Sequence, residues 1–201
     1  MTLYLISDTH FDHANIIEYC NRPFSTASEM DKYMIEKWNS RVSDNDTVFF
    51  GGDVAMARPE KAFEYVEKLN GSFVTLIGNH DDFTEESAPF PVFKYHHFEY
   101  EHENNDYEFY YSHYPSKAEP EYKDSYPNYA FPPEDFEGWN IHGHVHNNNT
   151  DDYPFINHDE QRVNLSVEVL NYTPITLTEL TEIIKKGNNY KTIEDIDCMN
   201  F

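Results

Sequence analysis

The chain has 201 residues, of which 39% are hydrophobic and 16% aromatic, enough apolar surface for a single folded domain. It carries 14 basic and 37 acidic side chains, a formal net charge of -23. Because polyanions are bound through lysine and arginine contacts to phosphates, this balance argues against duplex DNA or an anionic membrane as a main partner.

The first half of the chain predicts alternating strands and helices. Apolar runs at 3–6, 47–50 and 73–77 have the length and composition of buried strands. A helix is predicted after Thr26, a residue type that caps helix N-termini, and another from Pro59, which suits a first helical turn. This order of strands and helices indicates an α/β layered fold.

The second half is rich in aromatic, β-prone segments. Runs at 92–100 and 107–112 flank Asn104-Asn105-Asp106 and predict a hairpin. Two further strands are expected at 140–142 and 163–170.

The segments around these strands are less regular. Residues 115–137 hold many prolines and tyrosines without periodicity, and we interpret them as a long surface loop that serves as a substrate lid or a protein contact. Thr176 is expected to cap a last helix that ends at Gly187. We expect the tail, 188–201, to be loosely held.

Signals for targeting are weak, and we expect a cytoplasmic protein. The opening MTLYLISDTH has no basic segment and reaches Asp8 too early for a signal peptide. No apolar run approaches the roughly 20 residues of a membrane helix. The two cysteines, Cys20 and Cys198, do not form a metal-binding spacing, and reduced thiols are the default expectation.

Metal-type ligands follow the predicted strands at the point where each ends. Asp8 and His10 are two residues apart, so on an extended segment their side chains would point the same way. Asp53 follows two glycines, which let the backbone turn sharply. Asn79 and His80 are adjacent, so one can bind a metal while the other reaches a substrate.

Three more histidines complete the set. His113 ends the hairpin, and His144 and His146 are again two residues apart. Because ligands bind at the carboxyl ends of strands in open α/β sheets, we expect these side chains to lie close together there. The predicted metal ligands are Asp8, His10, Asp53, Asn79, His113, His144 and His146.

This mixture of carboxylates, an amide and imidazoles suits Mn, Fe, Zn or Mg better than calcium. The ligands are too many for one ion. Two ions that share Asp53 would lie roughly 3.5–4 Å apart, the usual spacing in two-metal hydrolytic sites. We therefore predict two divalent ions as cofactors, with Mn favoured and Fe, Zn, Ni or Mg as alternatives.

The ordered blocks resemble the calcineurin-like metallophosphoesterase superfamily. The opening DTHFDHANII and the NRPF segment are similar to a small stand-alone prokaryotic or phage subgroup of predicted phosphoesterases. The blocks that carry the resemblance are Asp8-x-His10, Gly52-Asp53, Gly78-Asn79-His80-Asp81, His113 and Gly143-His144-x-His146.

The resemblance implies a four-layer αββα sandwich and assigns roles by position. It places Asp8, His10, Asp53 and His146 on one metal, and Asp53, Asn79, His113 and His144 on the other. It also places His80 near the leaving group, with Asp81 orienting its ring. The implied reaction is hydrolysis of a phosphate ester, as a phosphodiesterase or phosphatase, by a hydroxide shared between the metals.

Two further residues are candidates for substrate binding. His13 lies three residues past His10 and either contacts the substrate or is a solvated histidine. Arg22 either clamps a phosphate or forms a surface salt bridge. For His142, inside a predicted strand, we expect a packing or supporting role.

Three functions are compatible with this pattern. The first is hydrolysis of a small phosphoester such as a nucleotide or cyclic nucleotide. The second is trimming of single-stranded nucleic-acid ends, against which the acidity counts. The third is a metal-binding scaffold that no longer catalyses, since a fold does not guarantee activity. The sequence does not indicate the oligomeric state.

Overall fold

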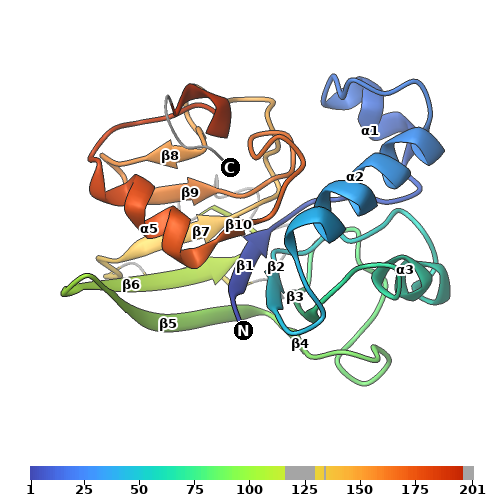
Figure 1. Cartoon of the computed structure of the whole chain (residues 1–201), viewed down its shortest axis with the longest axis horizontal. Helices are drawn as coiled ribbons and strands as arrows, with labels where there is room; N and C mark the ends of the chain where they lie inside the picture. The colour runs from blue at the N-terminus through green and yellow to red at the C-terminus, as the bar shows by residue number, and fades with distance from the viewer. Residues whose placement is uncertain (116–129, 134, 197–201) are drawn as a thin grey trace.

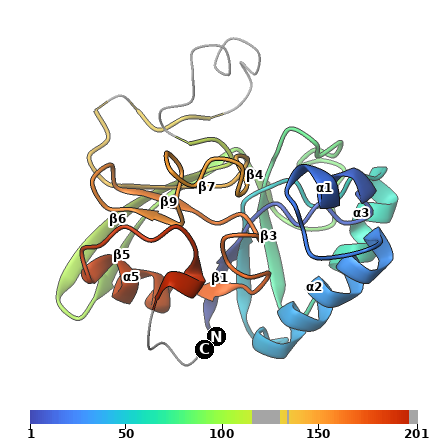
Figure 2. The same ribbon diagram turned by 90° about the horizontal axis from the view of Figure 1, so that it is seen from above.

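Two β-sheets pack against each other, and helices cover their outer faces (Figures 1 and 2). The computed structural model describes residues 1–115, 130–133 and 135–196. In Figure 2, α1, α2 and α3 lie on one outer side and α5 lies on the other. This arrangement confirms the predicted α/β sandwich of four layers.

The first sheet is built from the predicted apolar strands. Its parallel centre consists of β1 (Leu3–Ile6), β2 (Thr47–Phe50) and β3 (Ser72–Leu76). Parallel β4 (Val92–Phe93) and antiparallel β10 (Ile175–Thr176) form its edges, in the order β10-β1-β2-β3-β4. Because β1, β2 and β3 are parallel, their carboxyl ends lie at the same edge of this sheet.

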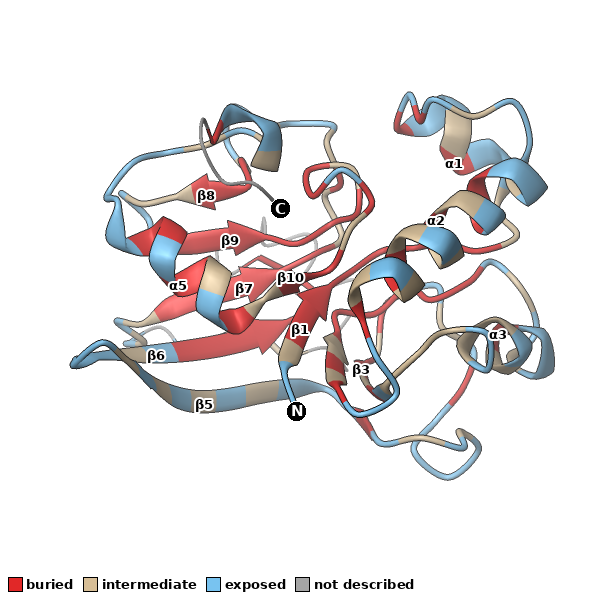
Figure 3. Cartoon of the chain, viewed as in Figure 1, coloured by how far each residue is buried: buried red, intermediate tan, exposed pale blue. Residues whose placement is uncertain are grey.

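The second sheet is mixed. The hairpin of β5 and β6 is antiparallel, β6 and β7 are parallel, and β7 and β9 are parallel, in the order β5-β6-β7-β9-β8. Figure 3 shows exposed and half-buried residues along β5 and buried ones along β7 and β9. The strands are β5 (Tyr95–His102), β6 (Asn105–Ser112), β7 (Trp139–His142), β8 (Ile156–Asn157) and β9 (Arg162–Asn164).

Each α-helix contains buried residues. In α2 (Ala27–Arg41), Met30, Met34 and Trp38 recur every four residues and are buried, as expected for an amphipathic helix. None of the helices among residues 1–115 and 135–196 is long and apolar enough to cross a membrane. The others are α1 (Ala14–Tyr19), α3 (Pro59–Val66), α5 (Leu177–Lys185) and the short 3-10 helix η1 (Ile193–Asp195).

The two sheets are joined next to the ligand-bearing loops. The backbone N–H of Ser7 donates to the carbonyl of Leu165 at 2.9 Å, and the N–H of Val167 donates to the carbonyl of Ser7 at 3.1 Å. Ser7 directly follows β1 and Leu165 directly follows β9. The carboxyl ends of the two sheets are therefore held together by the backbone itself.

Some predicted boundaries are wrong. The strand expected at 163–170 ends at Asn164. The N–H of Leu165 makes one more bond to the carbonyl of His142 on β7, and the chain then bonds to Ser7 through the carbonyl of Leu165 and the N–H of Val167. In the hairpin, the turn residues are Glu103 and Asn104, both with positive φ. Most of 115–137 lies outside the described residues.

The segment that we expected to be loose is partly fixed. Tyr190 forms a β-bridge with Ile156, and Ile196 is buried. Residues 197–201 lie outside the described part of the chain, so the prediction for them stays open.

Candidate metal centre

The loops that follow five strands meet at one place between the sheets. Asp8 and His10 follow β1, Asp53 follows β2 and Asn79 follows β3. On the second sheet, His113 follows β6, and His144 and His146 follow β7. Each sheet therefore contributes ligand-type side chains to this place.

The backbone at these ligands is left-handed, not extended as we expected. Asp8, His10, Asp53, His144 and His146 have φ between 50° and 68°. For residues with a side chain beyond Cβ, this conformation costs roughly 1–2 kcal/mol each. Strain of this kind persists at functional sites when the surrounding structure enforces it.

One group of ligands gathers Asp8, His10 and His146. A ligand atom from each lies within 4.8 Å of the others, and all three residues are buried. His146 Nε2 lies 3.9 Å from Asp8 Oδ1. The N–H of His144 donates to both oxygens of Asp8, at 3.0 and 3.1 Å, and fixes that carboxylate.

A second group gathers Asp53, His113 and His144, again within 4.8 Å of one another. The Asn79 side-chain oxygen lies 3.1 Å from His113 Nε2 and 2.9 Å from His144 Nδ1. Since the carbonyl of Gly51 accepts a hydrogen bond from His113 Nδ1 at 2.8 Å, the other ring nitrogen faces the ligand group.

Asp53 lies between the two groups. Its Oδ2 is 3.3 Å from His10 Nε2 and 3.5 Å from His113 Nε2. One carboxylate oxygen thus faces a histidine of each group.

The chemistry of these side chains fits divalent metals. Both ring nitrogens of His10 are buried and lack a hydrogen bond of good geometry. Asp8 and Asp53 are 0% and 1% exposed, and a buried carboxylate needs a cation or donors to offset its lost hydration. Nitrogen and oxygen ligands together favour Mn, Fe, Zn or Mg over calcium.

The protonation of the histidines follows from burial and from Asp53. Burial lowers the pKa of His144 to about 2, with His113 adding to the effect, so its imidazole is neutral and able to bind a metal. At His113 burial opposes protonation, but the Asp53 carboxylate more than offsets it and raises the pKa to about 9. A metal bound there would displace a proton.

Two glycines allow the loops to approach this closely. A Cβ on Gly78 would lie 2.1 Å from Asp53 Oδ1, and a Cβ on Gly143 would lie 2.1 Å from Asp8 Oδ2. Both distances are far shorter than a van der Waals contact. Glycine is therefore required immediately before Asn79 and His144.

Two histidines lie beside the ligands without belonging to either group. The exposed ring of His80 is 5.3 Å from that of His10, and the ring of His13 is 5.4 Å from it. The N–H of His80 donates to Asp53 Oδ1 at 2.8 Å. Burial, followed by the effect of His10, lowers the pKa of His13 to about 4.

Asp81 does not have the surroundings expected of a residue that orients His80. Its carboxylate accepts hydrogen bonds from the backbone N–H groups of Asp53, Val54 and Gly78 at 2.8–2.9 Å. Asp81 therefore joins the loop after β2 to the loop after β3.

Arg22 is neither a phosphate clamp nor part of a surface salt bridge. It is 4% exposed and pairs with Glu168 at 2.7 Å. Its remaining donors bind the backbone carbonyls of Asp8 and Thr9 at 2.9 and 2.8 Å and the sulfur of Met30 at 3.2 Å. A buried guanidinium with these partners has no donor directed at a substrate.

Glu168 is the site residue that the sequence analysis missed. It contacts His146 Nδ1 at 3.0 Å, and Cys20, His146 and Glu168 form a third cluster of ligand-type atoms. Burial would raise the pKa of Glu168, but His146 and Arg22 hold it well below its ordinary value. The sequence signal is an acidic residue inside the apolar run VNLSVEVL.

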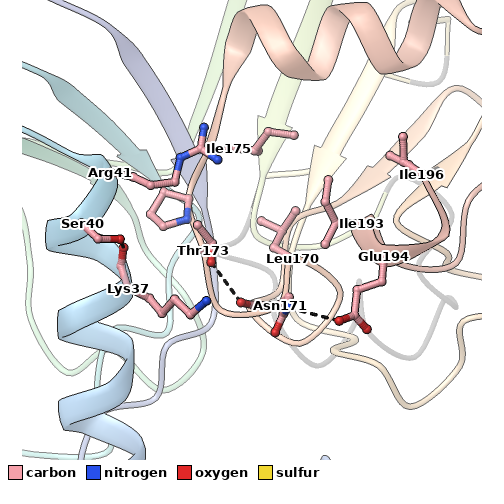
Figure 4. Close-up of a pocket in the computed structure, with 11 residues that line it drawn as sticks. Lys37, Ser40, Arg41, Leu170, Asn171, Thr173, Ile175, Ile193, Glu194 and Ile196 are labelled. Atoms are coloured by element: carbon pink, nitrogen blue, oxygen red, sulfur yellow. Dashed lines mark hydrogen bonds between the residues drawn. The ribbon is translucent and has the colours of Figure 1, made fainter. Parts of the chain in front are cut away.

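A separate cavity of about 560 Å³ lies between α2 and the C-terminal segment (Figure 4). Lys37 and Arg41 line one side, and Leu170, Ile193 and Ile196 line the other. None of the predicted metal ligands lines this cavity. It is therefore distinct from the metal centre.

Comparisons with known proteins agree with this geometry. A family model described as calcineurin-like phosphoesterase matches residues 1–196. An uncharacterized protein of Methanocaldococcus jannaschii is 44% identical over 196 residues, which cover 96% of this chain and 97% of that protein. The crystal structure of a protein of unknown function from Aquifex aeolicus matches with a TM-score of 0.62 and 25% identity, over 90% of this chain and 98% of that chain.

Proposed function

The chain belongs to the calcineurin-like phosphoesterase family, and we propose that it hydrolyses a small phosphate ester with two divalent cations. Metal-dependent hydrolysis of phosphoesters is the activity typical of this family. The two-metal centre, the role of His80 and the size of the substrate are our additions.

The position of Asp53 carries the proposal. A carboxylate oxygen within 3.3 and 3.5 Å of histidines from two ligand groups supports two ions that share it. When bound, such ions supply an activated water and offset negative charge on the phosphoryl group. We favour Mn, with Fe, Zn, Ni or Mg as alternatives.

Electrostatics support an anionic substrate at this place. Two dications outweigh the carboxylates of Asp8 and Asp53, so the loaded centre is positive on a chain of net charge -23. The acidic side chains on the rest of the chain disfavour the binding of long polyanions. A small phosphoester is therefore the substrate that this charge distribution favours.

His80 is the residue that we assign to the leaving group. It is exposed, its ring is 5.3 Å from that of His10, and its backbone is anchored to Asp53. From there it can donate a proton or a hydrogen bond to the departing oxygen. General acid catalysis of this kind contributes typically about 10²–10⁴-fold.

An add-back assay tests the proposal. Chelated protein would receive Mn, Mg, Ni or Zn and then an aryl phosphomonoester or an aryl phosphodiester. We expect hydrolysis of at least one ester with at least one metal, and loss of it in Asp53→Ala. Two bound metals without hydrolysis of either ester would instead favour a scaffold. Hydrolysis of single-stranded ends alone would favour a nuclease.

A further inference from the structure

The buried pair of Arg22 and Glu168 contacts both halves of the first ligand group. The Arg22 and Glu168 side chains are 0% and 2% exposed. Two of the Arg22 nitrogens, Nε and Nη2, lie 2.8 and 2.7 Å from Glu168 Oε1. The pair is therefore fully desolvated, and each charge depends on the other.

On one side the pair reaches the ligand loop of the first sheet. Arg22 Nη2 donates to the carbonyl of Asp8 at 2.9 Å, and Nη1 donates to the carbonyl of Thr9 at 2.8 Å. Asp8 and His10 both have left-handed backbones. The two hydrogen bonds hold the strained turn that presents these ligands.

On the other side the pair reaches the ligand loop of the second sheet. Glu168 Oε1 and Oε2 lie 3.0 and 3.2 Å from His146 Nδ1. A carboxylate paired with arginine is only an acceptor, so the Nδ1 nitrogen carries the proton. The Nε2 nitrogen, which faces Asp8, is then left to bind a metal.

We propose that Arg22 and Glu168 are positioning residues for the first metal, and that they select the Nε2 atom of His146 as its ligand. This inference rests on the proposed two-metal centre. Partners of metal-binding histidines typically contribute 10–100-fold to metal affinity or activity. Among the described residues, no hydrogen bond or ion pair joins this pair to Asp53, His113 or His144, so the second group should not depend on it.

Calorimetric titration of the chelated protein with Mn tests the proposal without any substrate. Wild type should bind two ions. In Glu168→Gln the charge is lost and an amide N–H can face Nδ1, so one site should weaken by about 10–100-fold while the other keeps its affinity. Arg22→Lys keeps the charge but cannot make all the hydrogen bonds, and it should weaken the same site.

The matched control is Arg41→Gln. It breaks a second Arg–Glu pair, in which Arg41 Nη2 lies 2.6 Å from Glu179, away from the ligand loops. Both Mn affinities should remain as in wild type. Unchanged binding in Glu168→Gln, or equal weakening of both sites, would overturn the positioning role.

A measurement on wild type alone covers the case in which the variants do not fold. In Zn-loaded protein, NMR of the His146 ring should show a proton on Nδ1 and none on Nε2. A proton on Nε2, or no metal uptake at all, overturns the inference. If wild type binds two ions but hydrolyses no phosphoester, the proposed function fails while this inference stands.

Discussion

The carboxylate of Asp81 accepts a hydrogen bond from the backbone N–H of Asp53 at 2.8 Å, and so fixes the residue that lies between the two ligand groups. Further N–H groups from Val54 and Gly78 complete its surroundings. Three backbone donors therefore depend on one side chain.

Replacing Asp81 by asparagine should destabilise the fold and the metal centre together. The new amide group would direct N–H toward backbone N–H, and an unsatisfied buried donor costs about 1–3 kcal/mol. We expect a loss of about 2–4 kcal/mol in urea unfolding with chelator present. Asp82→Asn, at the exposed neighbouring position, should change the free energy of unfolding by less than about 0.5 kcal/mol. Equal stability of the two variants would contradict this role.

Replacing His80 by alanine should slow hydrolysis without loss of metal. We expect a decrease in kcat of about 10²–10⁴-fold on an alkyl ester and a smaller one on an aryl ester, whose leaving group needs less protonation. Mn titration should match wild type. His97→Ala, at an exposed position on β5, provides the control. An unchanged rate on the alkyl ester would remove His80 from the reaction.

Removing metal should lower the thermal stability. Buried carboxylates and left-handed ligands are costly when no cation offsets them. At a free metal concentration of 100 times Kd, a single bound ion adds about 2.7 kcal/mol to the free energy of unfolding. For a domain of this size, this corresponds to an increase of about 5–10 °C in Tm. Comparing Tm in chelator and in Mn tests this. Asp53→Ala should lose most of the difference, and an identical Tm in both conditions would contradict a built site.

Stability should also fall with acid because of His142. Burial lowers the pKa of this histidine to about 3, so the folded chain holds it neutral while the unfolded chain protonates it below about 6.5. The part of the folding stability that depends on neutral His142 is fully present above pH 6.5 and is lost as the pH falls toward 3. Between pH 8 and pH 5 the loss is about 2 kcal/mol.

The variant His142→Leu tests this dependence. Unfolding with chelator at several pH values should show a shallower slope between pH 5 and 6.5 than in wild type. Ile141→Val, at the buried position before it on β7, should lower stability equally at all pH values. If the slope of His142→Leu equals that of wild type, His142 is not responsible.

The sequence was most informative where one local signal determines both structure and chemistry. The runs at 3–6 and 47–50 are apolar because parallel strands are covered on both faces, and each is followed by a polar ligand. For this reason the strands and the candidate ligands could be predicted together. The αββα sandwich followed from the family resemblance.

Features that depend on contacts between distant residues could not be predicted. Arg22 and Glu168 are 146 positions apart, and neither has a local signal for the other. The end of β9 depends on bonds between Ser7 and the residues after Asn164, while the apolar run continues unchanged. The left-handed backbone at His10 and His146 is likewise enforced by the assembled loops.

The division of the ligands between the two sheets has a consequence for biosynthesis. Each ligand group needs a histidine from beyond residue 112, so a nascent chain that ends earlier can complete neither. In the proposed two-metal centre, loading would therefore follow the arrival of the segment that carries His144 and His146. A truncated chain ending before Gly143 should therefore retain no tightly held ion after gel filtration.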